Sequence, residues 1–262
     1  MLKILGLFFL ILLSGSILNH SIIQNRTIKI PSIITFIVFV FLSLPLIEKY
    51  NNLNIAINLL LLTLIYTQII SFHESTSPKK KILKSGFFLG LMSLINTDFF
   101  LFFLLIFFTL IYYNQISWRH LSVLLIGVIY PWLIYYSLHF INFNLQLDIY
   151  NNHSLKEENI YHFQDNFIHL FVTLIILTLS LKELSINFYK KSEQAKKAFN
   201  VLFVLAFLIL FHLMLFQSLT ILYFLIVPFT IIVSNYLIYI KSKKIQTFLL
   251  GLLLISFMFK FL

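Results

Sequence analysis

Asp98 is the single charged residue in a long apolar stretch, residues 85–113, SGFFLGLMSLINTDFFLFFLLIFFTLIYY. A carboxylate at membrane depth is costly and usually functional, so Asp98 is a candidate general base or a proton or cation site. Asn96-Thr97-Asp98 also has the composition of a tight turn, because Asn and Asp side chains hydrogen-bond to their own backbone. The residue types favour the turn and leave the buried carboxylate as the alternative.

A second set of candidate residues belongs to the longest polar segment of the chain, residues 142–166. Ser154-Leu155-Lys156-Glu157 has the pattern of a capping box, which predicts that a helix begins at Ser154. Spacings of i, i+4, i+7 and i+11 place four side chains on one face of that helix: Glu158, His162, Asp165 and His169. Such a row of carboxylate and imidazole groups is a candidate site for a divalent metal ion. A solvated helix face that leads into a membrane has the same pattern and is the alternative interpretation.

Two further histidines, His139 and His212, lie near the ends of apolar runs at the level expected for Asp98, where the three side chains could converge. The chain has no Gly-rich phosphate loop and no serine nucleophile elbow. It also has no cysteine, which excludes disulfides, thiolate metal sites and cysteine nucleophiles. The sequence therefore predicts no cofactor, and it leaves open whether the protein is an enzyme.

The elements that must position these residues are membrane helices. Of the 262 residues, 60% are hydrophobic and 11% are charged, and the mean hydropathy is +0.96. Soluble domains are only roughly half apolar. The composition predicts an all-α fold, a polytopic integral membrane helical bundle in which residues 1–262 form a single transmembrane domain. Residues 142–166 are expected to be an extracytoplasmic loop with a short helix.

About ten apolar runs are candidate transmembrane helices. They are residues 4–18, 32–47, 53–72, 82–96, 98–113, 121–141, 167–184, 198–216, 219–240 and 245–261. Several are shorter than the ~20 residues that a perpendicular helix needs, so we expect local thinning of the bilayer or half-buried helices.

The distribution of charge predicts how residues 85–113 are built. If the chain reverses at Asn96-Thr97-Asp98, one side of the membrane collects most of the basic residues: Arg26, Lys29, Lys79, Lys80, Lys81, Lys84, Arg119, Lys182, Lys190, Lys191, Lys196, Lys197, Lys241, Lys243 and Lys244. The other side keeps Lys3, Lys49, Lys156 and Lys260. The positive-inside rule then assigns the first side to the cytoplasm, and the asymmetry collapses if the stretch is one helix. The net charge of +10 is thus explained by membrane orientation rather than by nucleic-acid binding.

The start of the chain leaves two topologies open. The reversal places Met1 outside, whereas Met1-Leu2-Lys3 before an apolar run is typical of an N-terminus that stays inside. The first run also has the pattern of a cleaved signal peptide. Cleavage alone, however, leaves the segments that follow on the wrong sides of the membrane. Alternatively, residues 32–47, interrupted by Pro45, do not cross, which gives roughly nine spans with the N-terminus inside. The uniform apolarity of this run speaks against an interfacial helix.

Two other patterns predict contacts. Gly86 and Gly90 form a GxxxG spacing that lets a neighbouring helix approach closely. Three Lys-rich segments, residues 79–84, 190–197 and 241–244, would form a basic inner rim that holds anionic lipid headgroups. A docking surface for an acidic partner is the alternative for this rim.

Residues 42–140 carry a resemblance. It rests on Asn54-Ile55-Ala56-Ile57-Asn58 and on GFFLGLMSLINTDFFLFFLLIFFTLIYYNQISWRHLSVLLIGVIYPWLIYY. The points that match best are Gly90, Ser93-Leu94, residues 99–112, Trp118-Arg119 and Gly127. With these residues the chain resembles an uncharacterised integral membrane family of flavobacteria and their relatives. The resemblance implies a protein of the inner membrane of a Gram-negative bacterium.

The same stretch is more loosely similar to multi-spanning glycosyltransferases that use polyprenyl-phosphate sugars. Those enzymes carry an acidic pair in their first outer loop, and the matching position here offers only Glu48. Asn96-Thr97-Asp98 stands where a basic residue would contact the lipid phosphate. The similarity therefore implies Glu48 and Asp98 as candidate catalytic residues of an enzyme or of an inactive relative.

We expect a non-enzymatic inner-membrane protein, an accessory or scaffold component of a cell-envelope assembly that binds the lipid bilayer and a membrane-protein partner. The alternative is a membrane enzyme that handles polyprenyl-phosphate-linked sugars. A transporter fits less well, because polar residues such as Asn58, Gln68 and Ser234 are too scattered to trace a pathway through the bilayer.

Overall fold

The computed structural model describes residues 2–49, 53–74, 78–141 and 167–258. Within these ranges the chain forms α-helices and short 3-10 helices and no strand, which confirms the all-α prediction. The elements are α1 (Leu2–Gln24), α2 (Ile34–Lys49), α3 (Leu53–Ile70), η1 (Ser71–Glu74), α4 (Pro78–Ile95), η2 (Thr97–Phe102), α5 (Phe103–Tyr112), α6 (Trp118–Phe140), α8 (Phe167–Asn187), η4 (Phe188–Lys190), α9 (Glu193–Phe216), η5 (Leu219–Leu225), α10 (Ile226–Tyr239) and α11 (Lys243–Met258).

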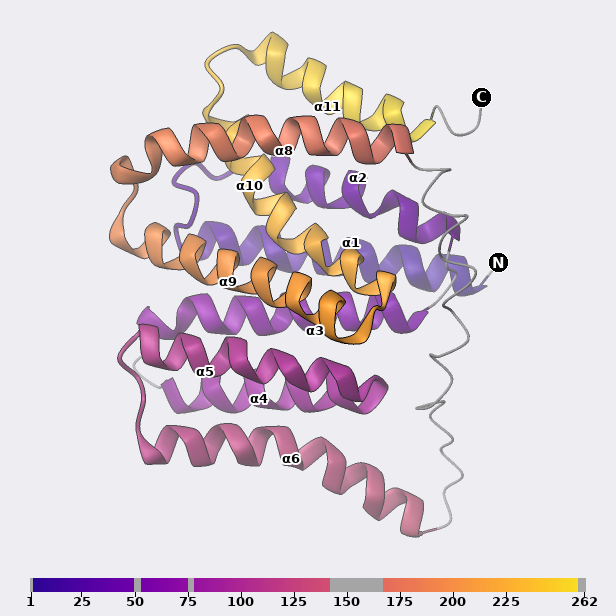
Figure 1. The fold of residues 1–262 in the computed structure, drawn as a ribbon, viewed down its shortest axis with the longest axis vertical. Coiled ribbons are helices and arrows are strands. Elements are labelled where there is room, and N and C mark those ends of the chain that lie inside the picture. Colours follow the sequence, from indigo (N-terminus) through magenta and orange to yellow (C-terminus); the bar gives the residue numbers. More distant parts are fainter. Residues whose placement is uncertain (1, 50–52, 75–77, 142–166, 259–262) are drawn as a thin grey trace.

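The helices lie side by side with roughly parallel axes, and the chain reverses direction from each to the next (Figure 1). α3 packs against α1 and α4, and α10 packs against α2 and α8. α3 and α10 form the centre of the bundle. In α3, 67% of the apolar segment is buried, and in η5–α10 72% is buried, whereas only 22% is buried in α6 at the edge. Helices that are apolar on every side, with their backbone hydrogen bonds satisfied internally, suit an environment without water.

The chain reverses at Asn96, as the charge distribution predicts. α4 ends at Ile95, and Asn96 has an extended backbone with φ −147° and ψ 118°. The Asn96 side-chain oxygen accepts a hydrogen bond from the N–H of Asp98 at 3.0 Å, which starts η2. α5 then returns beside α4 (Figure 1). Asp98 therefore occupies a turn between two helices and not the middle of one span.

α4 and α6 meet along a seam of glycines. A Cβ atom added to Gly90 would lie 2.5 Å from the carbonyl oxygen of Val128, and one added to Gly127 would lie 3.2 Å from the Cα of Gly86. A side chain at these positions would push the two backbones apart, so only glycine permits this separation. The close approach predicted from the GxxxG spacing is confirmed.

The described residues contain six helices that are long and apolar enough to cross a membrane, fewer than the expected ten or so. Two shorter apolar helices, residues 34–45 and 97–112, accompany them. α2 and α11 have only 16 residues each. α4 has 18 residues, but its first turns carry Lys79, Lys80, Lys81 and Lys84. Counting apolar runs thus gave more spans than helix length and charge support.

Candidate functional site

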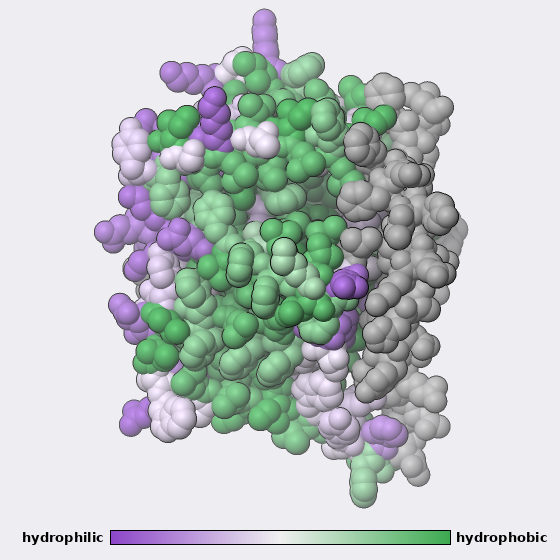
Figure 2. All heavy atoms as spheres, in the orientation of Figure 1, coloured by the Kyte–Doolittle hydropathy of each residue, from purple (hydrophilic) through white to green (hydrophobic). Residues whose placement is uncertain are grey.

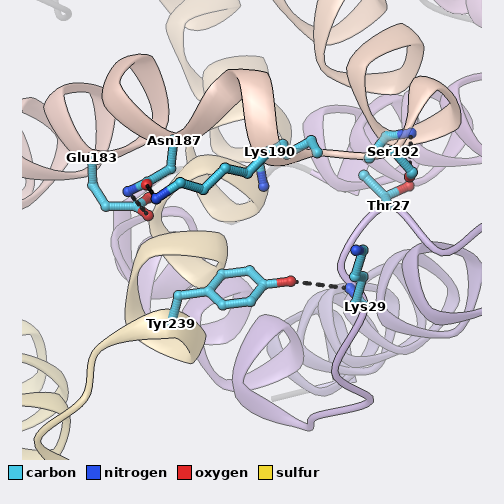
Figure 3. A pocket seen from close by; sticks show the side chains of 9 residues that line it. Thr27, Lys29, Glu183, Asn187, Lys190, Ser192 and Tyr239 are labelled. Carbon is cyan, nitrogen blue, oxygen red and sulfur yellow. Dashed lines mark hydrogen bonds between the residues drawn. The ribbon is translucent and has the colours of Figure 1, made fainter.

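A polar pocket lies at the end of the bundle where α1, α8 and α10 end and α9 begins (Figure 3). We call it the basic-end pocket. Its volume is about 360 Å³. Its lining residues are Thr27, Lys29, Glu183, Asn187, Lys190, Lys191, Ser192, Ala195 and Tyr239.

The end of α1 turns two of these residues into the pocket. Arg26 adopts a left-handed conformation with φ 50°. The N–H of Arg26 donates to the carbonyl of Ile23 and that of Thr27 to the carbonyl of Ile22, both at 3.1 Å. These two bonds form a Schellman motif, which ends the helix and reverses the chain. Thr27 and Lys29 therefore follow the turn toward α9 and α10.

The corner between α8 and α9 supplies the next residues. η4 follows α8 and ends at Lys190, and Lys191 is extended with ψ 151°. Ser192 is the N-cap of α9, and its hydroxyl accepts a hydrogen bond from the N–H of Ala195 at 3.4 Å. Two lysines and the N-terminus of a 24-residue helix thus converge on the pocket.

Hydrogen bonds connect polar side chains that line the pocket with one another and with Asn235 of α10. The Lys191 ammonium donates to Asn235 Oδ1 at 2.7 Å, and Asn235 Nδ2 donates to Glu183 Oε2 at 3.4 Å. Asn187 Nδ2 donates to Glu183 Oε1 at 3.1 Å, and the Lys190 ammonium donates to Asn187 Oδ1 at 3.0 Å. Asn235 is fully buried in α10. Both carboxylate oxygens of Glu183 therefore bind side-chain amides, which in turn hold the two lysines.

Aromatic rings and burial shape the electrostatics of Lys191. Its ammonium lies 4.7 Å from the ring centroid of Phe199 and 5.4 Å from that of Tyr239. Burial lowers the pKa of Lys191, Glu183 acts in the opposite direction, and Lys29 lowers it further. The charged form of Lys191 is thus incompletely compensated, because one carboxylate faces two ammonium groups.

Thr27 adds a hydrogen-bond donor. Its side chain is 2% exposed, and its hydroxyl has no hydrogen-bond partner among the described residues. Figure 3 shows Thr27 beside Ser192, on the opposite side of the pocket from Glu183 and Asn187. A buried hydroxyl without a partner is costly, and Thr27 belongs to the residues that line the cavity.

The candidate catalytic residues lie away from this pocket. Glu48 is the penultimate residue of α2. Asp98, half-buried, lies close enough to act electrostatically on His212 of α9. The structure thus places these two residues near each other, whereas His139 lies on the exposed end of α6 with its ring against Tyr135.

The imidazole of His212 is 1% exposed, and neither of its nitrogens has a hydrogen-bond partner among the described residues. The rings of Phe99, Phe102 and Phe216 surround it, with centroids 5.7, 6.3 and 4.6 Å away. Asp98 and His212 thus form a pair of ionisable groups at the end of the bundle opposite the basic-end pocket.

His169 is the one member of the predicted metal row that the described ranges include; Glu158, His162 and Asp165 lie outside them. His169 is 4% exposed, and its Nδ1 is hydrogen-bonded to Ser256 Oγ of α11 at 2.9 Å. The described part of the chain holds no group of three or more His, Cys, Asp or Glu side chains arranged for a metal ion. The metal row therefore stays a prediction.

The sequence indicated the lysines of the pocket but not the residues that organise them. Glu183 is an acidic residue at the basic end of α8, and its position before the Lys-rich segment was the available sign of a pairing. Thr27 and Asn235 stand in no recognisable pattern. Asn235 and Lys191 are 44 residues apart in sequence, so only the packing of α10 against α8 brings them together.

Fold and pocket define the class: a protein that is helical throughout its described residues, with six helices there able to cross a membrane and a polar site at its basic end. Within this class the chain belongs to the Family of unknown function (DUF6427), whose model matches residues 3–262. The expectation of an uncharacterised family is thereby confirmed. Comparisons with curated proteins and with solved structures give no match. A flavobacterial origin and a likeness to glycosyltransferases remain predictions.

Proposed function

We propose that this is a multi-pass protein of the bacterial inner membrane with its basic end in the cytoplasm, working as a non-enzymatic accessory component of a cell-envelope assembly. The orientation is supported by the connections α1–α2, α8–α9 and α10–α11 and by the starts of α4 and α6, which share one end (Figure 1). Figure 2 shows hydrophilic residues along that edge and apolar residues between the edges. The positive-inside rule places such an end in the cytoplasm.

The accessory role is supported by α6. This helix packs mainly on α4 and leaves most of its surface outside the bundle. The uncovered surface carries a cluster of aromatic residues, in which Tyr136 is 59% exposed and its ring lies against those of Trp132 and Tyr135. Aromatic side chains dominate the energetics of protein interfaces. We infer that α6 binds a second integral membrane protein.

The second candidate function is a transferase of polyprenyl-phosphate-linked sugars. The observation in its favour is the pair of Asp98 and His212, since a carboxylate beside an imidazole is able to act as general base. Glu48 also lies at the end of its helix away from the basic-end pocket.

One experiment separates the two candidates. The protein is purified from its native membrane in a mild detergent, and native mass spectrometry identifies what stays bound. The accessory role predicts a stoichiometric membrane-protein partner that is lost from Tyr136→Ala. The matched control is Phe207→Ala, because Phe207 is 65% exposed on α9 and its truncation should leave the partner bound. A polyprenyl-phosphate species bound without a partner would reject the accessory role and support the transferase.

A further inference from the structure

We propose that the basic-end pocket is a binding site for a phosphate group, carried by an anionic lipid headgroup or by a soluble phosphate ester. The inference concerns this pocket and goes beyond the accessory role. Only its lipid form rests on the proposed membrane orientation, which would put the pocket at the level of the headgroups.

Charge is the first argument. Lys29, Lys190 and Lys191 line the pocket, and Glu183 is the acidic lining residue. The Glu183 carboxylate is held by the amides of Asn187 and Asn235. Three ammonium groups therefore line the pocket with one carboxylate, which leaves an excess of positive charge for a ligand. A phosphate group beside these ammonium groups would form charge-assisted hydrogen bonds.

The helix terminus is the second argument. Ser192 and Ala195 of the first turn of α9 line the same pocket. The first N–H groups of a helix have no partner within it, and the helix dipole adds a partial positive charge at that end. The Ala195 N–H already binds the Ser192 hydroxyl, so α9 contributes the positive end of its dipole to the pocket rather than a free N–H group.

The Thr27 hydroxyl is an independent sign of a ligand. The hydroxyl is buried and lacks an acceptor among the described residues, and Thr27 is one of the residues that line the cavity. A hydroxyl donates one hydrogen bond, and a phosphate oxygen is a strong acceptor for it. A pocket of about 360 Å³ has room for the phosphate and part of its substituent.

The test measures binding to the full-length protein in a mild non-ionic detergent by isothermal titration calorimetry. The probes are glycerol 3-phosphate as a soluble ester, short-chain phosphatidic acid as an anionic lipid, and short-chain phosphatidylcholine as the zwitterionic control. Saturable binding of the first two identifies a soluble phosphate ligand. Binding of phosphatidic acid alone identifies a lipid headgroup. If neither binds, or if phosphatidylcholine binds as well as phosphatidic acid, the proposal is wrong.

Variants assign the binding to the pocket. Thr27→Val removes the hydroxyl and keeps the shape, and we expect it to raise the Kd about tenfold. Thr230→Val is the matched control, because Thr230 in α10 also has a buried hydroxyl without a partner among the described residues but does not line the pocket. Lys190→Gln should likewise weaken binding about tenfold, and Lys79→Gln, an exposed lysine of α4, should not.

Equal losses in pocket and control variants would overturn the assignment, since they would indicate general attraction to a basic surface. Thermal unfolding without ligand shows whether each variant folds. The result is independent of the proposed function: soluble phosphate binding does not require the membrane orientation, and loss of the α6 partner does not affect the pocket.

Discussion

At the scale of single residues, the charge of Lys191 is only partly compensated within the fold. One amide oxygen, two aromatic rings and the nearby charge of Glu183 stabilise its ammonium where burial removes water. Burial lowers its pKa below the ordinary value of 10.5. An anion in the pocket would restore the compensation, so the same residue connects stability with ligand binding.

This pKa shift predicts how stability depends on pH. Below the lowered pKa, folded and unfolded chains both keep the proton, and the cost of burying the charge is fully present. Between the lowered pKa and 10.5, the folded protein releases the proton while the unfolded chain still binds it, so the free energy of unfolding rises with pH. The melting temperature of the wild type minus that of Lys191→Met should therefore increase as the pH approaches 10.5.

The other groups that face Lys191 are Glu183, Lys29 and Tyr239. Both proteins keep all three groups, so the difference between the two melting temperatures isolates the contribution of Lys191. A difference that stays flat or falls with pH would show that burial does not disfavour the charged lysine.

At the scale of helices, residue pattern predicted much of what the structure contains. The turn at Asn96-Thr97-Asp98 follows from a local Asx hydrogen bond, and the distribution of charge along the whole chain also requires a reversal there. The number of spanning helices was predicted less well. An apolar run signals burial in lipid or in protein alike, and its ends are set by neighbours that the sequence does not show.

The glycine seam between α4 and α6 gives the prediction at this scale. Gly90→Ala would place a Cβ atom 2.5 Å from the carbonyl oxygen of Val128 and 2.9 Å from Cγ of Pro131. Because both lie on the α6 helix, the helices must separate, and we expect a loss of about 1–3 kcal/mol in the free energy of unfolding. Denaturation in mixed micelles, followed by circular dichroism, measures it.

Gly251→Ala is the matched control for the seam. A Cβ atom on Gly251 of α11 would have no atom within 4 Å, and alanine favours the helix by roughly 0.5–1 kcal/mol. Its stability should stay equal or rise. If Gly90→Ala is as stable as Gly251→Ala, the contact between α4 and α6 is not close enough to require glycine.

At the scale of the whole molecule, the two ends of the bundle differ in chemistry. One end holds the Lys-rich connections and the basic-end pocket, and the other holds Asp98 and His212 (Figures 1 and 2). The sequence predicted this division from charge alone, because it depends on helix order and not on packing. It did not predict the pocket, since Thr27, Lys191 and Asn235 come from three separate parts of the chain.

Whether α2 crosses the membrane decides on which side the start of α1 lies. It packs against α1, α10 and α11, and its Val38 and Phe39 are fully buried in the core. Burial of α2 among three other helices favours a helix that crosses the membrane with them. With α2 crossing, the start of α1 lies at the end opposite the basic connections, so a split-GFP strand placed before Leu2 should not be complemented in the cytoplasm.

Because the chain has no cysteine, single cysteines report the other connections without background. Thr97→Cys should react with an impermeant maleimide in intact spheroplasts, and Lys241→Cys should react only after lysis. If the strand before Leu2 is complemented in the cytoplasm while the two cysteines react as expected, α2 does not cross the membrane. If the two cysteines react in the reverse order, the basic end lies outside.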